Sequence, residues 1–186
     1  MQATLRKKDY AAIARQLREH LVGRFADVTV EIGDDIHYKG VNIVVTTRVF
    51  DGLLPEQRYH HVVHAVPPDF YEKHLRGGVV WFELAPGQTG REYMKMPRSE
   101  DVADEAAKIE ARLAKAGFFD RFAEAVDEAG ELSRDDFVLA KRLLGEAGAK
   151  ADEIERATLY FVLRGAFCDA DLPNTVLATP DEDDED

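Results

Sequence analysis

The fold of this chain is decided at residues 41–52, which read VNIVVTTRVFDG. Alternate apolar residues fall on one face of an extended chain, which predicts a strand from Ile36 to about Phe50. Phe50 is placed to fill the space between a sheet and a following helix. Gly52 can adopt a backbone conformation that residues with a Cβ disfavour. The stretch therefore predicts a strand that leaves the sheet through a turn and enters a helix.

The residues before this stretch predict a helix and a second strand. Apolar residues recur at three- and four-residue steps between positions 8 and 23, which indicates a helix with one buried face. Apolar and polar residues then alternate over residues 28–32, as in a half-buried strand. Gly33-Asp34-Asp35 supplies turn chemistry. We therefore expect the two strands to form a hairpin.

The residues after the stretch complete an α+β domain. Pro55 suits the first turn of a helix, where its missing N–H is harmless. A second short helix is expected at residues 69–76, with Gly77 as its left-handed stop. Val79–Leu84 is a third strand. The predicted fold class is α+β, in the order αββααβ, with a three-stranded sheet backed by helices.

The helix after Pro55 carries three histidines, His60, His61 and His64. At about 100° per residue they fall opposite an apolar stripe, so we expect the three rings to face outward and to contact a partner protein. Arg58 is expected to reach carbonyl groups at the strand exit and to belong to the same partner-binding set. The apolar stripe comprises Tyr59, Val62, Val63 and Val66.

His60 and His64 stand one helical turn apart, so their imidazoles are also spaced to chelate a metal ion. His61 occupies the place that the general-base glutamate has in the zinc-protease motif His-Glu-x-x-His, which argues against hydrolysis of that type. A structural metal site needs about four ligands. We expect no metal, and a site at His60 and His64 is kept as an alternative.

Several of these residues resemble the BolA family, whose fold belongs to the type II KH-like class. His37-Tyr38-Lys39 opens the second strand, the turn with Phe50 and Gly52 leaves it, and Arg58 follows after five residues, as in that family. The resemblance covers about residues 8–88. It implies a protein that binds monothiol glutaredoxins and shares a [2Fe-2S] cluster with them.

The chain departs from that family where the cluster ligands are implied. Residues 75–81 contain no histidine before the last strand, the predicted hairpin loop is short, and Tyr59 replaces the histidine of an Arg-His pair. We therefore expect no resident cofactor, and a shared [2Fe-2S] cluster is the alternative. The expected partner is another protein, with a monothiol glutaredoxin as one candidate.

Charge divides the chain into two parts. Residues 1–98 hold 14 Lys+Arg and 12 Asp+Glu, whereas residues 99–186 hold 10 and 24. This difference predicts a BolA/KH-like domain at 1–92 and an acidic helical domain at 99–172. The tail at 173–186 ends in six consecutive acids, a run that repels itself, so disorder is expected there.

Nucleic-acid binding is the main alternative function, because KH-like domains include nucleic-acid binders. The acidic half is a poor candidate, since phosphate contacts need clustered cations. In the first domain, Arg48, Arg58 and Lys73 are the residues that would meet phosphates. No Gly-x-x-Gly loop of the kind that clamps RNA in KH domains lies between the predicted helices. Protein binding is therefore the first hypothesis.

The second domain is predicted to be a small helical bundle. Ser133 is expected to be the N-cap of a helix over Arg134–Leu144, with Asp136 as the capping-box acid. Residues 151–167 are apolar around much of a helix circumference, which predicts the central helix of the bundle.

Residues 118–144 resemble an EF-hand in outline. Only Asp127 and Asp136 then occupy ligand positions, whereas Ca²⁺ takes six to eight oxygens. A helical hairpin with an acidic turn is therefore expected here, without calcium.

The sequence holds no nucleophile–base–acid arrangement and no glycine-rich phosphate loop, so no catalytic residue is expected. One cysteine, Cys168, excludes an intramolecular disulfide and favours a reducing compartment. No window approaches the roughly 18 apolar residues of a membrane span. These observations predict a non-catalytic, cytoplasmic adaptor that acts by binding another protein.

Overall fold

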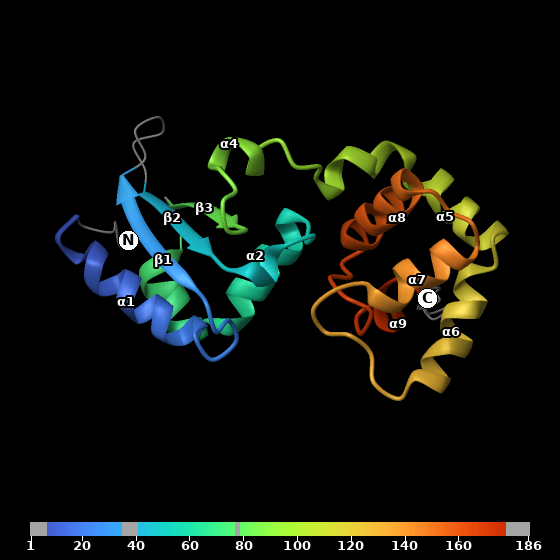
Figure 1. Cartoon of the computed structure of the whole chain (residues 1–186), viewed down its shortest axis with the longest axis horizontal. Helices are drawn as coiled ribbons and strands as arrows, with labels where there is room; N and C mark the ends of the chain where they lie inside the picture. The colour runs from blue at the N-terminus through green and yellow to red at the C-terminus, as the bar shows by residue number, and fades with distance from the viewer. Residues whose placement is uncertain (1–6, 35–40, 77–78, 178–186) are drawn as a thin grey trace, which may run out of the picture. The chain divides into compact units, whose positions relative to one another are not determined.

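The computed structural model describes residues 7–34, 41–76 and 79–177. The chain divides into two compact units, Met1–Met96 and Pro97–Asp186 (Figure 1). Every described helix is too short or too polar to cross a lipid bilayer.

The first unit has the predicted α+β class and the order αββααβ. Its elements are α1 (Tyr10–Leu21), β1 (Thr29–Asp34), β2 (Val41–Thr46), α2 (Pro55–Ala65), α3 (Pro68–Phe70), β3 (Val79–Leu84) and α4 (Gly90–Tyr93). A 3₁₀ turn at Lys7–Asp9 precedes α1, and a π-helical turn at Tyr71–Leu75 extends α3. The predicted short helix is thus two different helical turns in succession. Its predicted stop, Gly77, lies outside the described residues.

The three strands form one mixed sheet in the order β1-β2-β3. β1 and β2 are antiparallel, with Val30 opposite Val45, and β2 and β3 are parallel, with Ile43 opposite Trp81. The core lies between one face of this sheet and the helices. It includes Ile13, Leu17 and Leu21 of α1, Ile43 and Val45 of β2, and Val62 of α2.

The second strand is shorter than predicted and ends at Thr46. The Thr47 hydroxyl donates a hydrogen bond to Asp27 Oδ1 (2.5 Å) and accepts one from Val49 N–H (3.4 Å), which turns the chain into a 3₁₀ turn at Arg48–Phe50. Phe50 is fully buried, its ring centroid 5.7 Å from that of Phe25, so it fills the predicted space. Gly52 has φ 74°, the conformation expected for it.

The hairpin is present, but two residues of the predicted turn, Gly33 and Asp34, belong to β1. Gly33 and Asp34 continue β1 and pair with Asn42 and Val41. Residues 35–40, which include His37-Tyr38-Lys39 of the BolA resemblance, lie outside the described residues. The start of the second strand predicted at Ile36 lies there too.

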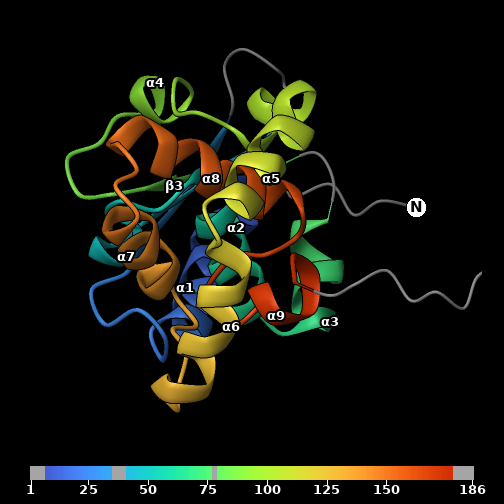
Figure 2. The same cartoon turned by 90° about the vertical axis from the view of Figure 1, so that its right-hand side faces the viewer.

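The second unit is helical, as predicted. Its helices are α5 (Ala106–Lys115), α6 (Phe118–Ala129), α7 (Val138–Glu146), α8 (Ala151–Leu163) and α9 (Leu172–Thr175), with a 3₁₀ helix at Ser99–Glu105 before them. In Figure 2, α5 and α6 follow one another along one side of this unit, and α7 and α8 lie beside them. Phe161 of α8 is fully buried among Phe118, Phe137 and Tyr160. α8 is therefore the central helix, although it ends before Gly165, whose φ is 88°.

The helix predicted over Arg134–Leu144 begins later, at Val138. Ser133 Oγ accepts hydrogen bonds from the N–H groups of Asp135 and Asp136, so it closes a local turn rather than capping the helix. The Asp136 carboxylate accepts two hydrogen bonds from Lys141 Nζ, both at 2.8 Å. Asp136, one of the two calcium-ligand positions in the EF-hand resemblance, is therefore paired with a lysine of the same unit. The first residues of the tail predicted to be disordered from residue 173 belong to α9, and the tail is described only as far as residue 177.

Candidate partner-binding surface

Helix α2 holds all the partner-binding residues predicted from the sequence. Its start is well defined, because Pro55 occupies the first turn and Gln57 Oε1 accepts a hydrogen bond from Leu54 N–H at 3.1 Å. Its buried side comprises Pro55, Gln57, Arg58, His61 and Val62. The opposite side presents Tyr59, His60, Val63 and His64, which are exposed or half-buried. The predicted set is therefore divided between two faces of the helix.

Arg58 is buried, only 2% exposed, so its expected place on the partner surface is wrong. Its Nε donates to the Leu53 carbonyl at 2.9 Å, and its Nη1 donates to the Glu83 carbonyl and to Gln88 Oε1, both at 2.7 Å. The guanidinium also lies 5.9 Å from the ring centroids of Phe50 and Tyr93. Arg58 therefore ties the start of α2 to the end of β3, and its role is structural.

His61 is also buried, at 1% exposure, which corrects the expectation that all three rings face outward. An N–H of Arg24 lies 2.8 Å from His61 Nδ1. Because arginine only donates hydrogen bonds, Nδ1 must accept, and the proton of a neutral ring then sits on Nε2. His61 is therefore a satisfied internal histidine. Tyr59, which had been placed in the apolar stripe, is instead 37% exposed.

His60 and His64 remain together on the accessible side of α2. Their ring centroids are 4.1 Å apart, with a tilt of 40° between the planes. In the part of the chain that the structure describes, no group of three His, Cys, Asp or Glu side chains is placed to hold a metal ion. His74, in the turn after α3, packs against Phe70 with ring centroids 4.9 Å apart. The pair is brought together without the ligands that a structural zinc site needs.

Aromatic side chains from two other elements continue the accessible side of α2. The hydroxyl groups of Tyr59 and Tyr71 are hydrogen-bonded at 2.7 Å, and the Tyr59 ring meets Trp81 of β3 edge-on, with centroids 6.2 Å apart. Burial, assisted by the Tyr71 hydrogen bond, raises the pKa of Tyr59 well above its ordinary value, so it stays neutral at neutral pH. We call the combined patch the α2 surface. It comprises Tyr59, His60, Val63, His64, Tyr71 and Trp81.

The cations proposed to contact nucleic acid do not form a cluster. Arg58 is buried, as described above. Arg48 is exposed, but its Nε lies 3.8 Å from Asp27 Oδ2, and its N–H donates to the same oxygen at 3.1 Å. Hydrogen bonds from Thr47 and from Arg48 N–H lower the pKa of Asp27, so this neutralising charge persists at neutral pH. Lys73 is exposed in the turn after α3. Of the three cations, it is the one that remains a candidate for contact with phosphate.

Sequence reasoning missed Tyr59, Tyr71 and Trp81 as parts of an accessible patch. A helical wheel assigns one buried side, whereas α2 buries the side that holds Arg58 and His61 and leaves Tyr59 near the sheet edge. The available signal was the hydroxyl of each tyrosine, since a buried tyrosine or one at an interface needs a partner for that group.

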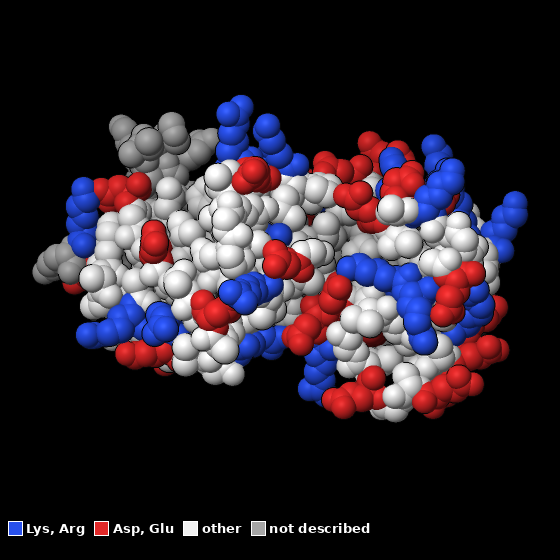
Figure 3. Space-filling model, in the orientation of Figure 1, with Lys and Arg blue, Asp and Glu red and all other residues white. Residues whose placement is uncertain are grey.

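Uncharged side chains cover most of the α+β unit in the view of Figure 3, and acidic and basic side chains cover much of the helical unit. Comparison of the chain with protein-family models, with curated proteins and with solved structures found no match, so the function is argued from the α2 surface itself.

Proposed function

We propose that this chain is a non-catalytic adaptor that binds another protein through the α2 surface. The observation that carries the proposal is the composition of that surface, in which the aromatic group of Tyr59, Tyr71 and Trp81 and the pair of imidazoles are accessible, with the half-buried Glu56 as the acidic residue on that side of α2. The cores of protein–protein interfaces are enriched in tyrosine and tryptophan and depleted of charged residues. Phosphate-binding surfaces have the opposite composition.

The arrangement of the patch also suits binding. Tyr59 is held by its hydroxyl and by the edge of Trp81, so little side-chain freedom remains for a partner to remove. His60 and His64 lie against each other with tilted rings, and the exposed His64 offers ring nitrogens to hydrogen-bond donors or acceptors. A rigid aromatic anchor beside adaptable polar groups is the composition of many binding hot spots.

The BolA-like assignment is part of this proposal. The αββααβ order, the buried Phe50, the left-handed Gly52 and the carbonyl contacts of Arg58 support it. A monothiol glutaredoxin is accordingly the first named partner to test. Residues 75–81 contain no histidine or cysteine, so a [2Fe-2S] cluster shared with that partner would need a ligand from another part of the chain.

The test is affinity purification with the tagged full-length chain, compared with the double variant His60→Ala/His64→Ala. We expect the variant to lose partners that the native chain retains, including a purified monothiol glutaredoxin if that is the partner. His20→Ala is the matched control, because His20 is an exposed histidine of α1 outside the α2 surface. Identical partner profiles for all three proteins would contradict the proposal.

The same preparations separate the alternatives. Binding of labelled RNA or DNA at low salt that Arg48→Ala abolishes, and that the histidine double variant leaves unchanged, would replace protein binding by nucleic-acid binding. Elemental analysis of the purified native chain would show whether His60 and His64 hold a metal. A stoichiometric metal that is lost in the double variant would favour the metal-binding alternative.

A further inference from the structure

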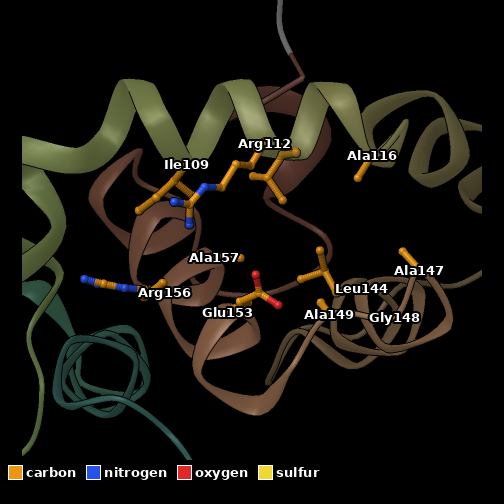
Figure 4. Close-up of a pocket in the computed structure, with 11 residues that line it drawn as sticks. Ile109, Arg112, Ala116, Leu144, Ala147, Gly148, Ala149, Glu153, Arg156 and Ala157 are labelled. Atoms are coloured by element: carbon orange, nitrogen blue, oxygen red, sulfur yellow. The ribbon is translucent and has the colours of Figure 1, made fainter.

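The helical unit contains a cavity of about 300 Å³ that the proposed function does not use. Residues from α5, from the end of α7 with the turn after it, and from α8 line it (Figure 4). Its floor is apolar and comprises Ile109, Leu113, Leu144 and Ala157, all of which are buried. The volume lies at the lower limit of small-molecule pockets, which span roughly 300–1,000 Å³, so a ligand here must be small.

Three charged side chains line the cavity, and two of them have partners inside the unit. Arg156 Nη2 lies 3.1 Å from Glu105, and its guanidinium points away from the centre of the cavity in Figure 4. Glu153 Oε2 accepts a hydrogen bond from Lys150 N–H at 3.0 Å. Glu153 therefore stabilises the start of α8, and Arg156 links α8 to the 3₁₀ helix before α5.

The third charged residue, Arg112, is different. Its guanidinium has no hydrogen-bond or ion-pair partner among residues 7–34, 41–76 and 79–177. Figure 4 shows the side chain on the α5 side of the cavity, with its guanidinium beside Ile109 and on the opposite side from Glu153. An arginine fork without a carboxylate above an apolar floor is a site for a planar anion with an apolar body.

We propose that this cavity binds a small aliphatic monocarboxylate. The carboxylate accepts hydrogen bonds from the Arg112 guanidinium, and the alkyl chain lies on Ile109, Leu113 and Leu144. Glu153 faces the same cavity, so a second negative charge on the ligand would be repelled. The site therefore discriminates by charge and by size, and it favours one carboxylate on a short chain.

The experiment is a titration of the full-length chain with hexanoate, monitored by calorimetry and by NMR chemical-shift changes. Hexanamide, a neutral molecule of the same shape, is titrated for comparison. We expect hexanoate to bind and hexanamide to bind at least about ten-fold more weakly, the size of a lost charge-assisted hydrogen bond. Arg112→Gln should weaken hexanoate binding by a similar factor. Glu153→Gln should strengthen it, because the amide still accepts the Lys150 N–H and no longer repels the ligand.

The matched control is Arg134→Gln, since Arg134 is an exposed arginine of the same unit that does not line the cavity. It should leave the affinity for hexanoate unchanged. Arg112 is exposed, so its substitution should leave the fold intact, which far-UV circular dichroism will show. Equal affinity for hexanoate and hexanamide, or an unchanged affinity in Arg112→Gln, would overturn the proposal.

Discussion

Each unit of this molecule contains a buried ionisable side chain that forms hydrogen bonds with backbone groups at the end of a helix or strand. The two side chains differ in the sequence separation of their partners. In the α+β unit, Arg58 donates to the carbonyl of Leu53, five residues earlier, and to that of Glu83 in β3. In the helical unit, the fully buried Asp169 accepts hydrogen bonds from the N–H groups of Leu139 and Ala140, at 2.6 and 3.0 Å.

The difference shows why the first unit was easier to predict. The Leu53 carbonyl lies only five residues before Arg58 in the chain, so local sequence reasoning could anticipate a carbonyl partner for this arginine. Asp169 caps a helix that begins about 30 residues earlier, and no local signal points to it. Ser133, the obvious local cap, closes a turn instead.

The chain offers one probe for each unit. Its single tryptophan, Trp81, lies in the α+β unit, and its single cysteine, Cys168, lies buried in the helical unit. Burial, with the nearby Asp171 carboxylate, raises the pKa of the Cys168 thiol to about 11, so the folded thiol reacts slowly at neutral pH. Tryptophan fluorescence and thiol labelling therefore report the two units separately.

The largest expected effect tests whether the units unfold separately. Phe161→Ala removes a ring whose centroid lies 5.4 Å from those of both Phe118 and Phe137, and it should destabilise the helical unit by about 4 kcal/mol. Labelling of Cys168 should become faster, while the unfolding midpoint followed by Trp81 fluorescence should stay unchanged. A shift of both signals together would show that the two units unfold as one.

The second effect tests the corresponding contact in the α+β unit. Arg58→Ala leaves the Leu53 and Glu83 carbonyls without their donor inside the protein and should cost about 3 kcal/mol. The urea midpoint followed by Trp81 fluorescence measures this loss. Arg48→Ala is the control, because Arg48 is an exposed arginine of the same unit and should change stability far less. Equal losses in both variants would contradict the structural role of Arg58.

A smaller effect is expected at the long-range cap. Asp169→Ala removes the acceptor for two N–H groups at the start of α7 and should destabilise the helical unit by about 2 kcal/mol. Urea unfolding followed by Cys168 labelling measures the loss. Asp104→Ala is the control, since Asp104 is an exposed aspartate of the same unit and lies in the 3₁₀ helix before α5. An unchanged stability would show that α7 does not need the cap.

Asp169 also predicts a dependence on pH. Burial raises the pKa of this carboxyl above its usual 3.8, although the two N–H donors oppose the shift. The folded state then holds this proton to higher pH than the unfolded state does, so the contribution of Asp169 to stability falls as pH rises from 3.8 through the folded pKa. Asp169→Asn should remove that slope. Stability curves of the two proteins between pH 3.5 and 7, measured by urea unfolding at about half-unit steps, will show whether it does.

The smallest effect on stability is expected at the α2 surface. His60→Ala/His64→Ala should change the free energy of unfolding by no more than about 0.5 kcal/mol, because both rings lie on the accessible side of the helix. Trp81 fluorescence in urea measures it. A large loss of stability would mean that the two histidines stabilise the fold. A loss of partner binding in that variant could then not be attributed to lost contacts between the histidines and the partner.

Much of the first unit could be predicted from its residues because strands and helices leave periodic patterns. Val79–Leu84 was predicted with its observed bounds, and Pro55 marks the observed start of α2. The accessible site was predicted only in part. His60 and His64 belong to it, whereas Arg58 and His61 are buried. A helical wheel places residues around an axis but does not say how much of the circumference the neighbouring elements cover.

The amino-acid sequence by itself determined the α+β class of the first unit, the helical nature of the second and the burial of Phe50, since apolar periodicity and turn chemistry act over a few residues. Only the tertiary structure decided that Arg24 meets His61, that Asp169 starts α7, and that Tyr59, Tyr71 and Trp81 share one patch. These contacts join residues 12 to 37 positions apart. Their geometry depends on how whole elements pack, which no local pattern encodes.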